Sequence, residues 1–270
     1  MLTKDLNPFI VAISATRRAQ MTNSVTVSIV SHNHGNQVSR LVDQVLADPL
    51  VNRLVLTLNI PELLKLPQSH RLTIVENERP KGFGANHNSA FMYCNTPLFC
   101  VLNPDIELRE DSFAELAQTL CEHQAGVAGP KVLAADGRQE DSWRAFPTPQ
   151  KLLLKAFGRD KTIMRLEESA ESLFPDWVAG MCMLFRSDSF RQVGGFDERF
   201  FLYYEDVDIC VRLWNAKEKI VAAPRSVVEH NAQRASHRNL THMRWHLISM
   251  ARYLLLYSYR LSKNRGNRIH

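Results

Sequence analysis

Short apolar runs alternate with segments of helical periodicity through the first half of this chain, and this alternation limits its fold more than any other feature. Runs typical of buried strands occupy residues 25–31, 54–58, 72–75, 98–102 and 127–133. Helices are expected between them, around residues 38–46, 82–93 and 113–120. Strands and helices that alternate through short links predict an α/β fold with a mixed, mainly parallel sheet flanked by helices.

The second half of the chain is less regular. Pro147 and Pro149 mark a break, and the charged segment 159–171 is expected to be an exposed excursion. The remaining expected elements are an apolar run at 177–185, a helix at 207–214, short strands at 220–223 and 227–228, and a long helix at 240–257. Ligands of such sheets bind beyond the carboxyl ends of the strands, so polar residues that follow strands are the first candidates for a site.

The composition is that of a folded globular protein. Of the 270 residues, 45% are hydrophobic and 23% are charged. Nowhere does an apolar stretch approach the ~18–20 residues that are needed to span a bilayer. The one apolar run near the N-terminus, residues 9–15, is short and has its charges in the wrong order for a secretory signal. We therefore expect residues 1–22 to form an N-terminal arm.

The cysteines indicate a reducing compartment. There are five of them, an odd number, and none are spaced as CxxC. This pattern argues against both a disulfide framework and a zinc site. Most of the cysteines lie in apolar surroundings, so buried thiols in a reducing cytosol are expected.

The positive charge is concentrated at the C-terminal end. The whole chain has a net charge of +5, whereas residues 225–270 contain nine Lys and Arg and a single Glu, a net +8 that leaves −3 for the rest. A basic tail on a mildly acidic body favours an anionic partner: membrane lipid, a diphosphate or nucleic acid. Nucleic acid is disfavoured because no recognition motif is found.

The first acidic motif is Asn103-Pro104-Asp105, which directly follows the apolar run 98–102. All three residue types favour turns, so a purely structural role is one interpretation. The other is metal binding, because the Asp105 carboxylate is a hard oxygen ligand suited to Mg²⁺ or Mn²⁺. Such ions commonly bind one or two carboxylates together with the phosphates of a substrate.

The second acidic motif contains Glu205, Asp206 and Asp208 and follows an aromatic stretch. Acids in the first turn of a helix are stabilised by its dipole without any catalytic role, and Asp208 with Arg212 is an ordinary i,i+4 ion pair. Alternatively, one of these carboxylates is a general base in a partly dry site.

Two further features are ambiguous. His230 follows a probable strand, where a histidine is either structural or a metal ligand. Lys81-Gly82-Phe83-Gly84 is neither a GxGxxG motif nor a Walker loop. Its glycines indicate either a tight turn or a backbone that lets a diphosphate approach the start of a helix.

The apolar stripe of the long C-terminal helix, residues 240–257, also permits two interpretations. It is interleaved with Arg244, Arg252 and Arg260 and accompanied by aromatic side chains. The stripe either packs on the protein core or lies in a lipid interface, and one helix can do both along its length.

Taken together, these motifs resemble glycosyltransferase family 2, with the GT-A fold. The segments that carry the resemblance are VSIVSHNHG (27–35), KGFGANHN (81–88), LNPDIEL (102–108), WVAGMCMLFR (177–186) and VGGFDERFFLYYEDVDICVRL (193–213). Within the family, the chain is most similar to bacterial rhamnosyltransferases that use dTDP-L-rhamnose and act on lipid-linked GlcNAc. The segment RWHLISMARYLL (244–255) supports this narrower resemblance.

The resemblance implies a role for individual residues. Asp206 matches the catalytic base, with Glu205 beside it, and Asp105 and His230 match metal ligands. Matches on the nucleotide-sugar side are Ser31, His32, Asn33, Asn59, Lys81, Gly82, Asn88, Asn103 and Asp105. Matches on the acceptor side are Trp177, Gly180 and Asp208. Asn103 and Asn59 stand where the family commonly has acids, and residues 215–218 lack the glycine usual after the helix.

The resemblance also implies the reaction: a metal-dependent, inverting sugar transfer from a dTDP-sugar to a polyprenyl-diphosphate-linked sugar in surface polysaccharide assembly, such as that of O-antigen. The cofactor would be Mg²⁺ or Mn²⁺. The enzyme would lie on the inner face of the bacterial inner membrane and contact anionic lipid through its basic C-terminal region. A GT-A domain is expected over residues 23–236, followed by an amphipathic helix and tail over 237–270. The alternatives are a sugar nucleotidyltransferase and a degenerate transferase that only binds nucleotide-sugar.

Overall fold

A computed structural model describes residues 24–157, 174–231 and 240–263. The expected N-terminal arm and the charged segment 159–171 lie outside the described residues. The strands are β1 (Val25–Ser31), β2 (Val51–Leu58), β3 (Leu72–Glu76), β4 (Leu98–Leu102), β5 (Ile106–Leu108), β6 (Val127–Ala134), β7 (Trp143–Arg144), β8 (Trp177–Val178), β9 (Cys182–Arg186) and β10 (Ile220–His230). The helices are α2 (Asn36–Ala47), α3 (Phe83–Phe91), α4 (Ser112–Glu122), α5 (Pro149–Ala156), α6 (Ser187–Gln192), α7 (Glu205–Asn215) and α8 (Leu240–Lys263).

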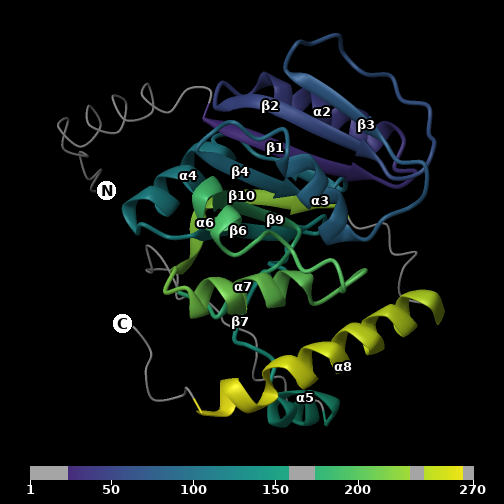
Figure 1. The fold of residues 1–270 in the computed structure, drawn as a ribbon. Coiled ribbons are helices and arrows are strands. Elements are labelled where there is room, and N and C mark those ends of the chain that lie inside the picture. Colours follow the sequence, from purple (N-terminus) through teal and green to yellow (C-terminus); the bar gives the residue numbers. More distant parts are fainter. Residues whose placement is uncertain (1–23, 158–173, 232–239, 264–270) are drawn as a thin grey trace, which may run out of the picture.

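Eight strands form one twisted sheet in the order β3-β2-β1-β4-β9-β6-β10-β5, with helices on its faces (Figure 1). The strands β3, β2, β1 and β4 are parallel, as are β6 and β10, whereas β9 and β5 run antiparallel to their neighbours. The prediction of a mixed, mainly parallel sheet flanked by helices is therefore confirmed. A separate pair of short strands, β7 and β8, lies outside this sheet.

The antiparallel strand β9 brings the second half of the chain next to the end of β4. Asn103, directly after β4, donates its backbone N–H to the carbonyl of Met181 at 2.9 Å, just before β9 begins. At the far side of the sheet, β10 pairs with β5 so that His230 lies opposite Ile106. The end of β4, the start of β9 and the end of β10 consequently meet at one edge of the sheet.

Side chains of successive strand residues point to opposite faces of the sheet, so each central strand contributes to two cores. On β4, Leu98, Cys100 and Leu102 join a core with α2 and α4, whereas Phe99 and Val101 join a second core with α6 and α7. This burial on both faces is the reason that the strand sequences are almost continuously apolar.

Two local expectations needed correction. The strands expected at 220–223 and 227–228 are one strand, β10, whose register with β6 shifts between Ala223 and Val227. Pro224 lies in that interval, and a proline cannot donate to the strand ladder. The apolar run 177–185 is divided into β8 and β9 by a turn at Gly180.

Helix α8 packs on the body of the domain through aromatic residues, and α7 lies between it and the sheet (Figure 1). Tyr253 and Tyr257 belong to the same core as the apolar face of α7. Other apolar side chains of α8 face outward: Leu247 is 52% exposed and Leu255 is 87% exposed. None of the helices within the described residues combines the length and apolar character needed to cross a bilayer.

Candidate active site

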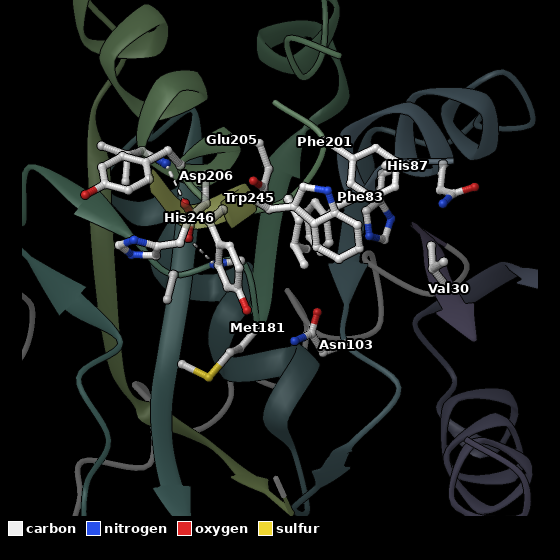
Figure 2. A pocket seen from close by; sticks show the side chains of 18 of the residues that line it. Val30, Phe83, His87, Asn103, Met181, Phe201, Glu205, Asp206, Trp245 and His246 are labelled. Atoms are coloured by element: carbon white, nitrogen blue, oxygen red, sulfur yellow. Dashed lines mark hydrogen bonds between the residues drawn. The ribbon is translucent and has the colours of Figure 1, made fainter. Parts of the chain in front are cut away.

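A cleft of ≈ 1160 Å³ opens at the edge of the sheet where the carboxyl ends of β1, β2 and β4 lie. Its lining includes residues from both acidic motifs, Asn103 and Asp105 on one side and Glu205 and Asp206 on the other. Figure 2 shows Asn103, Asp206 and Trp245 projecting toward the same hollow. Two motifs that are about a hundred residues apart in the sequence thus share one cavity.

Asp105 and His230 form a close pair at one side of the cleft. His230 Nε2 lies 3.1 Å from Asp105 Oδ2, and His230 Nδ1 lies 2.8 Å from a carboxylate oxygen of Glu140. Burial by itself would lower the pKa of His230, but the two carboxylates outweigh it and raise the pKa to about 9. The two acids therefore favour the protonated histidine, and a metal that bound its Nε2 would have to displace that proton.

The same pair is suited to a divalent metal. Asp105 Oδ1 is buried and has no hydrogen-bond partner among the described residues, so an oxygen lone pair in the site is unused. A carboxylate oxygen and an imidazole nitrogen are both ligands that Mn²⁺ accepts. Within the described part of the chain, no group of three or more His, Cys, Asp and Glu side chains is placed to hold an ion. Further ligands would therefore have to come from water or a substrate.

Asp206 is oriented by the backbone. Its Oδ2 accepts a hydrogen bond from the N–H of Gly180 at 3.0 Å, and its Oδ1 accepts one from the N–H of Val207 at 2.8 Å. An added Cβ at Gly180 would lie 3.6 Å from the carboxylate, an ordinary van der Waals distance, so the contribution of this residue is its backbone N–H. Burial raises the pKa of Asp206 despite these bonds. The result is a fixed carboxylate at the cleft with a proton affinity above that of an ordinary aspartate.

Glu205 differs from its neighbour Asp206 in its surroundings. Its side chain is only 5% exposed, and Oε2 has no hydrogen-bond partner among the described residues. Burial, followed by the charge of Asp206, raises the pKa of Glu205 well above its usual range. The two adjacent acids are thus distinguished: Glu205 is disfavoured as an anion and Asp206 is the hydrogen-bonded carboxylate.

Another part of the cleft lining is a network of amides that surrounds Lys81. Asn59 Oδ1 accepts a hydrogen bond from the backbone N–H of Lys81 at 2.8 Å, and Asn59 Nδ2 donates to the Lys81 carbonyl at 3.0 Å. Asn77 donates to both Asn59 and Asn86. This network fixes the loop before α3, which carries Gly82, against the end of β2.

Comparison with known proteins identifies the family to which the chain belongs. The model of a family described as "Glycosyltransferase like family 2" matches residues 22–246, more than four-fifths of the chain. The chain belongs to glycosyltransferase family 2. Its fold is the GT-A fold of that family, as the resemblance implied.

Two relatives of this family 2 chain are rhamnosyltransferases by name. The chain is 28% identical to Rhamnosyltransferase WbbL of Escherichia coli (strain K12) over 246 residues, which are 85% of this chain and 92% of the relative. It is 32% identical over 154 residues to the N-acetylglucosaminyl-diphospho-decaprenol L-rhamnosyltransferase of Mycobacterium tuberculosis (strain ATCC 25618 / H37Rv). The second match spans 52% of this chain and 48% of that relative.

Solved structures agree on the fold. The mannosyltransferase PcManGT of Pyrobaculum calidifontis, in complex with GDP-Man and Mn²⁺, superposes with a TM-score of 0.56 at 14% identity over 92% of this chain and 72% of that one. GalNAc-T7, crystallised with UDP, GalNAc and Mn²⁺, gives a TM-score of 0.60 at 17% identity over 81% of this chain and 45% of that one. At such low identity, the likeness concerns the fold alone.

Most of the residues singled out from the sequence of this family 2 protein are brought together. Those that line the cleft are His32, Asn59, Lys81, Gly82, Asn103, Asp105, Trp177, Gly180, Glu205 and Asp206. His230 lies directly behind Asp105. Ser31, at the end of β1, is fully buried, whereas Asn33 is exposed on the following turn.

Asn88 and Asp208 lie outside the lining of the cleft because their side chains have structural partners. Asn88 bonds to both backbone groups of Phe196, at 2.8 and 2.9 Å, and so secures the segment that leads to α7. Asp208 is buried between Arg212 and Tyr257, and the i,i+4 ion pair with Arg212 is present. We therefore carry neither residue into the proposed site.

Several cleft residues were not anticipated from the sequence. Arg144 on β7 lines the cleft near Trp177, and His34 lines it near Asp105. From α8 come His242, Trp245 and His246. Their i, i+3, i+4 spacing marks one face of a helix and was the available signal, but it does not reveal what that face contacts.

Proposed function

We propose that this glycosyltransferase is a metal-dependent, inverting enzyme that moves L-rhamnose from dTDP-L-rhamnose to a hydroxyl of a lipid-diphosphate-linked sugar. The observation that carries the proposal is that Asp206 and Asp105 line one cleft, with His230 in contact with Asp105. The choice of sugar and acceptor is supported by the names of the two rhamnosyltransferase relatives. A role in bacterial surface polysaccharide assembly, such as that of O-antigen, belongs to the same proposal.

In this proposal Asp206 removes the proton from the acceptor hydroxyl. Its carboxylate is held by the N–H groups of Gly180 and Val207, so it meets the acceptor in one orientation. The raised pKa makes it a stronger base than an ordinary aspartate. Attack by the deprotonated hydroxyl, on the face opposite the leaving diphosphate, inverts the anomeric configuration.

Asp105 and His230 would hold the divalent metal, Mg²⁺ or Mn²⁺, and the unused Oδ1 of Asp105 supports this assignment. A bound ion would neutralise the charge that develops on the leaving diphosphate, as divalent ions do in phosphate chemistry. On the nucleotide-sugar side, the proposed contacts are the cleft-lining residues His32, Asn59, Lys81, Gly82 and Asn103. Trp177 and Gly180 are assigned to the acceptor side.

The proposed location is the inner face of the bacterial inner membrane, with the C-terminal region against anionic lipid. Leu247 and Leu255 of α8 are exposed apolar side chains, and Arg244 on the same helix is exposed and basic. Apolar residues combined with basic ones bind an anionic interface through both burial and charge.

A ligand screen followed by a product assay tests the proposal. Thermal denaturation is measured with dTDP-, UDP- and GDP-sugars, with and without divalent metal, because a ligand that binds only the folded protein stabilises it by RT ln(1 + [L]/Kd). We expect dTDP-L-rhamnose with metal to give the largest shift, and dTDP to be released when a lipid-diphosphate-linked GlcNAc is added. Release of pyrophosphate from dTTP would instead identify a nucleotidyltransferase, and binding without turnover a degenerate transferase.

A further inference from the structure

An aromatic wall stands beside Asp206 and is shared between two distant parts of the chain. Its members line the cleft and are Phe201, Tyr203, Tyr204, His242, Trp245 and His246. The rings of Phe201 and Trp245 lie 4.8 Å apart between centroids at an interplanar angle of 39°, and His242 lies 5.1 Å from Trp245. In Figure 2, Trp245 and Phe201 lie on one side of Asp206 and His246 lies on the other.

The backbone of the turn before α7 is strained at Tyr203 and Tyr204, two members of the wall. Tyr203 and Tyr204 have φ values of 70° and 69°, in the left-handed region that bulky residues seldom adopt. Strained backbone of this kind persists only where surrounding contacts hold it, and it gathers at functional sites. Here the strain turns both tyrosines toward α8, where Tyr203 meets His242 at 3.1 Å and Tyr204 packs against His246.

Helix α8 is fastened to the same turn by separate polar contacts. Ser249 donates a hydrogen bond to the carbonyl of Leu202 at 2.9 Å, and Arg252 donates one to the carbonyl of Arg199. Each contact comes from a side chain of α8 and reaches the backbone of the turn. These contacts hold α8 against the turn, so the wall has a fixed position in the cleft.

The position of the wall indicates which substrate it meets. Lys81, Asn59 and Asp105 also line the cleft, and the proposed function places the nucleotide diphosphate among them. The wall reaches the loop of Lys81 at Phe201, whose carbonyl accepts a hydrogen bond from the N–H of Phe83 at 2.9 Å, and it reaches the acidic pair at Tyr204, which directly precedes Glu205. The wall lies next to Asp206, which takes a proton from the acceptor. Aromatic rings have apolar faces that pack on the C–H face of a sugar ring, whereas their N–H and O–H groups can bind its hydroxyls.

We propose that this wall is the subsite for the acceptor's sugar ring, with Trp245 as the stacking platform. The inference rests on the proposed function and deepens it, because it assigns recognition of the acceptor to α8 and to the turn before α7. The sugar held on the wall would present its hydroxyl to Asp206. The lipid of the acceptor would extend away from the cleft.

The first test compares variants of one helix. Trp245→Ala should raise the acceptor KM by roughly tenfold, with the donor KM changed less than about twofold. Trp245→Phe, which keeps a ring, should restore most of the acceptor binding. Met243→Ala is the matched control, because Met243 is 57% exposed and is not among the residues that line the cleft. An unchanged acceptor KM in a normally folded Trp245→Ala protein would overturn the inference.

A second test separates the sugar from the lipid. The acceptor is supplied as the same sugar diphosphate on a short alkyl chain and on a polyprenyl chain. If the wall holds the sugar, Trp245→Ala should raise the acceptor KM by the same factor with both acceptors. A rise in KM confined to the polyprenyl acceptor would overturn the assignment. Failure of the proposed function would look different, since the wild-type protein itself would then transfer no sugar to either acceptor.

Discussion

The hydroxyl of Tyr257 on α8 donates a hydrogen bond to Oδ1 of Asp208 on α7 at 2.6 Å. Asp208 is fully buried, and its Oδ2 accepts two further bonds from Arg212. A buried carboxylate needs such partners, because an unpaired charge in the interior is costly. This contact attaches α8 to the domain and thereby supports the aromatic wall.

The two buried tyrosines of α8, Tyr253 and Tyr257, allow a matched pair of substitutions. Tyr257→Phe removes a hydrogen bond to a charged group, so we expect the free energy of unfolding to fall by about 1–3 kcal/mol. Tyr253→Phe should be neutral or stabilising, because the Tyr253 hydroxyl is buried with no hydrogen-bond partner among the described residues. Denaturant unfolding of both variants checks this. Equal losses in the two proteins would contradict it.

Replacing Asp206 by Asn should remove the proton acceptor while keeping the shape of the side chain. We expect kcat to fall by about 10²–10⁴-fold and donor binding to persist. Turnover and a thermal-shift titration with nucleotide-sugar measure the two effects. Asp188→Asn serves as the control, since Asp188 is a surface carboxylate with 91% of its side chain exposed. Retained turnover in the Asp206 variant would exclude it as the base.

The pH dependence of the reaction should reflect the surroundings of Asp206. Burial raises its pKa, and the base must be ionised to accept a proton. The acidic limb of kcat/KM is therefore expected at higher pH than the ~3.9 of an ordinary aspartate. A profile of kcat/KM against pH tests this, and full activity down to the ordinary value would refute it.

Glu205 should lower stability at neutral pH and above. Its folded-state pKa is raised, so the folded protein binds more protons than the unfolded chain, and stability falls as pH rises above the unfolded value of about 4.3. Glu205→Gln removes this penalty, and we expect its melting temperature to exceed that of the wild type by a few degrees at about pH 8. The advantage should vanish near pH 4. A difference in melting temperature that stays constant between about pH 4 and pH 8 would show that ionisation of Glu205 does not cause it.

His87 should make the protein sensitive to acid. It is fully buried against Ser28 Oγ at 2.8 Å, and burial lowers its pKa from 6.5 to about 3. Because the unfolded chain binds the proton more readily, stability is lost as pH falls below about 6.5, by about 2 kcal/mol at pH 5. His87→Gln should show a smaller loss between neutral pH and pH 5 in thermal denaturation. Identical acid sensitivity of the two proteins would be the contrary result.

Much of the fold was predictable because it depends on local pattern. The run that became β4 is continuously apolar, that of β1 alternates between apolar and polar residues, and the stripe on α2 has helical spacing, so all three were found from short windows. The three-residue strand β5 was not predicted, since it is too short to carry a periodic signal. Its pairing with β10 nevertheless decides where His230 lies.

Sequence motifs also indicated more site residues than the cleft contains. Asn88 and Asp208 belong to the same motifs as Gly82 and Asp206, but their side chains are used in packing. Spacing along a helix indicates which residues share a face. Whether that face meets a cleft or the interior depends on neighbouring elements.

The sequence by itself determined the alternation of strands and helices in the first half of the chain and placed Asp105 at the end of a strand, since both follow from periodicity within a few residues. Only the tertiary structure decided that Trp245 packs against Phe201 in one wall of the cleft. That contact joins residues that are more than forty positions apart. It depends on how α8 packs against α7, and no local pattern specifies that packing.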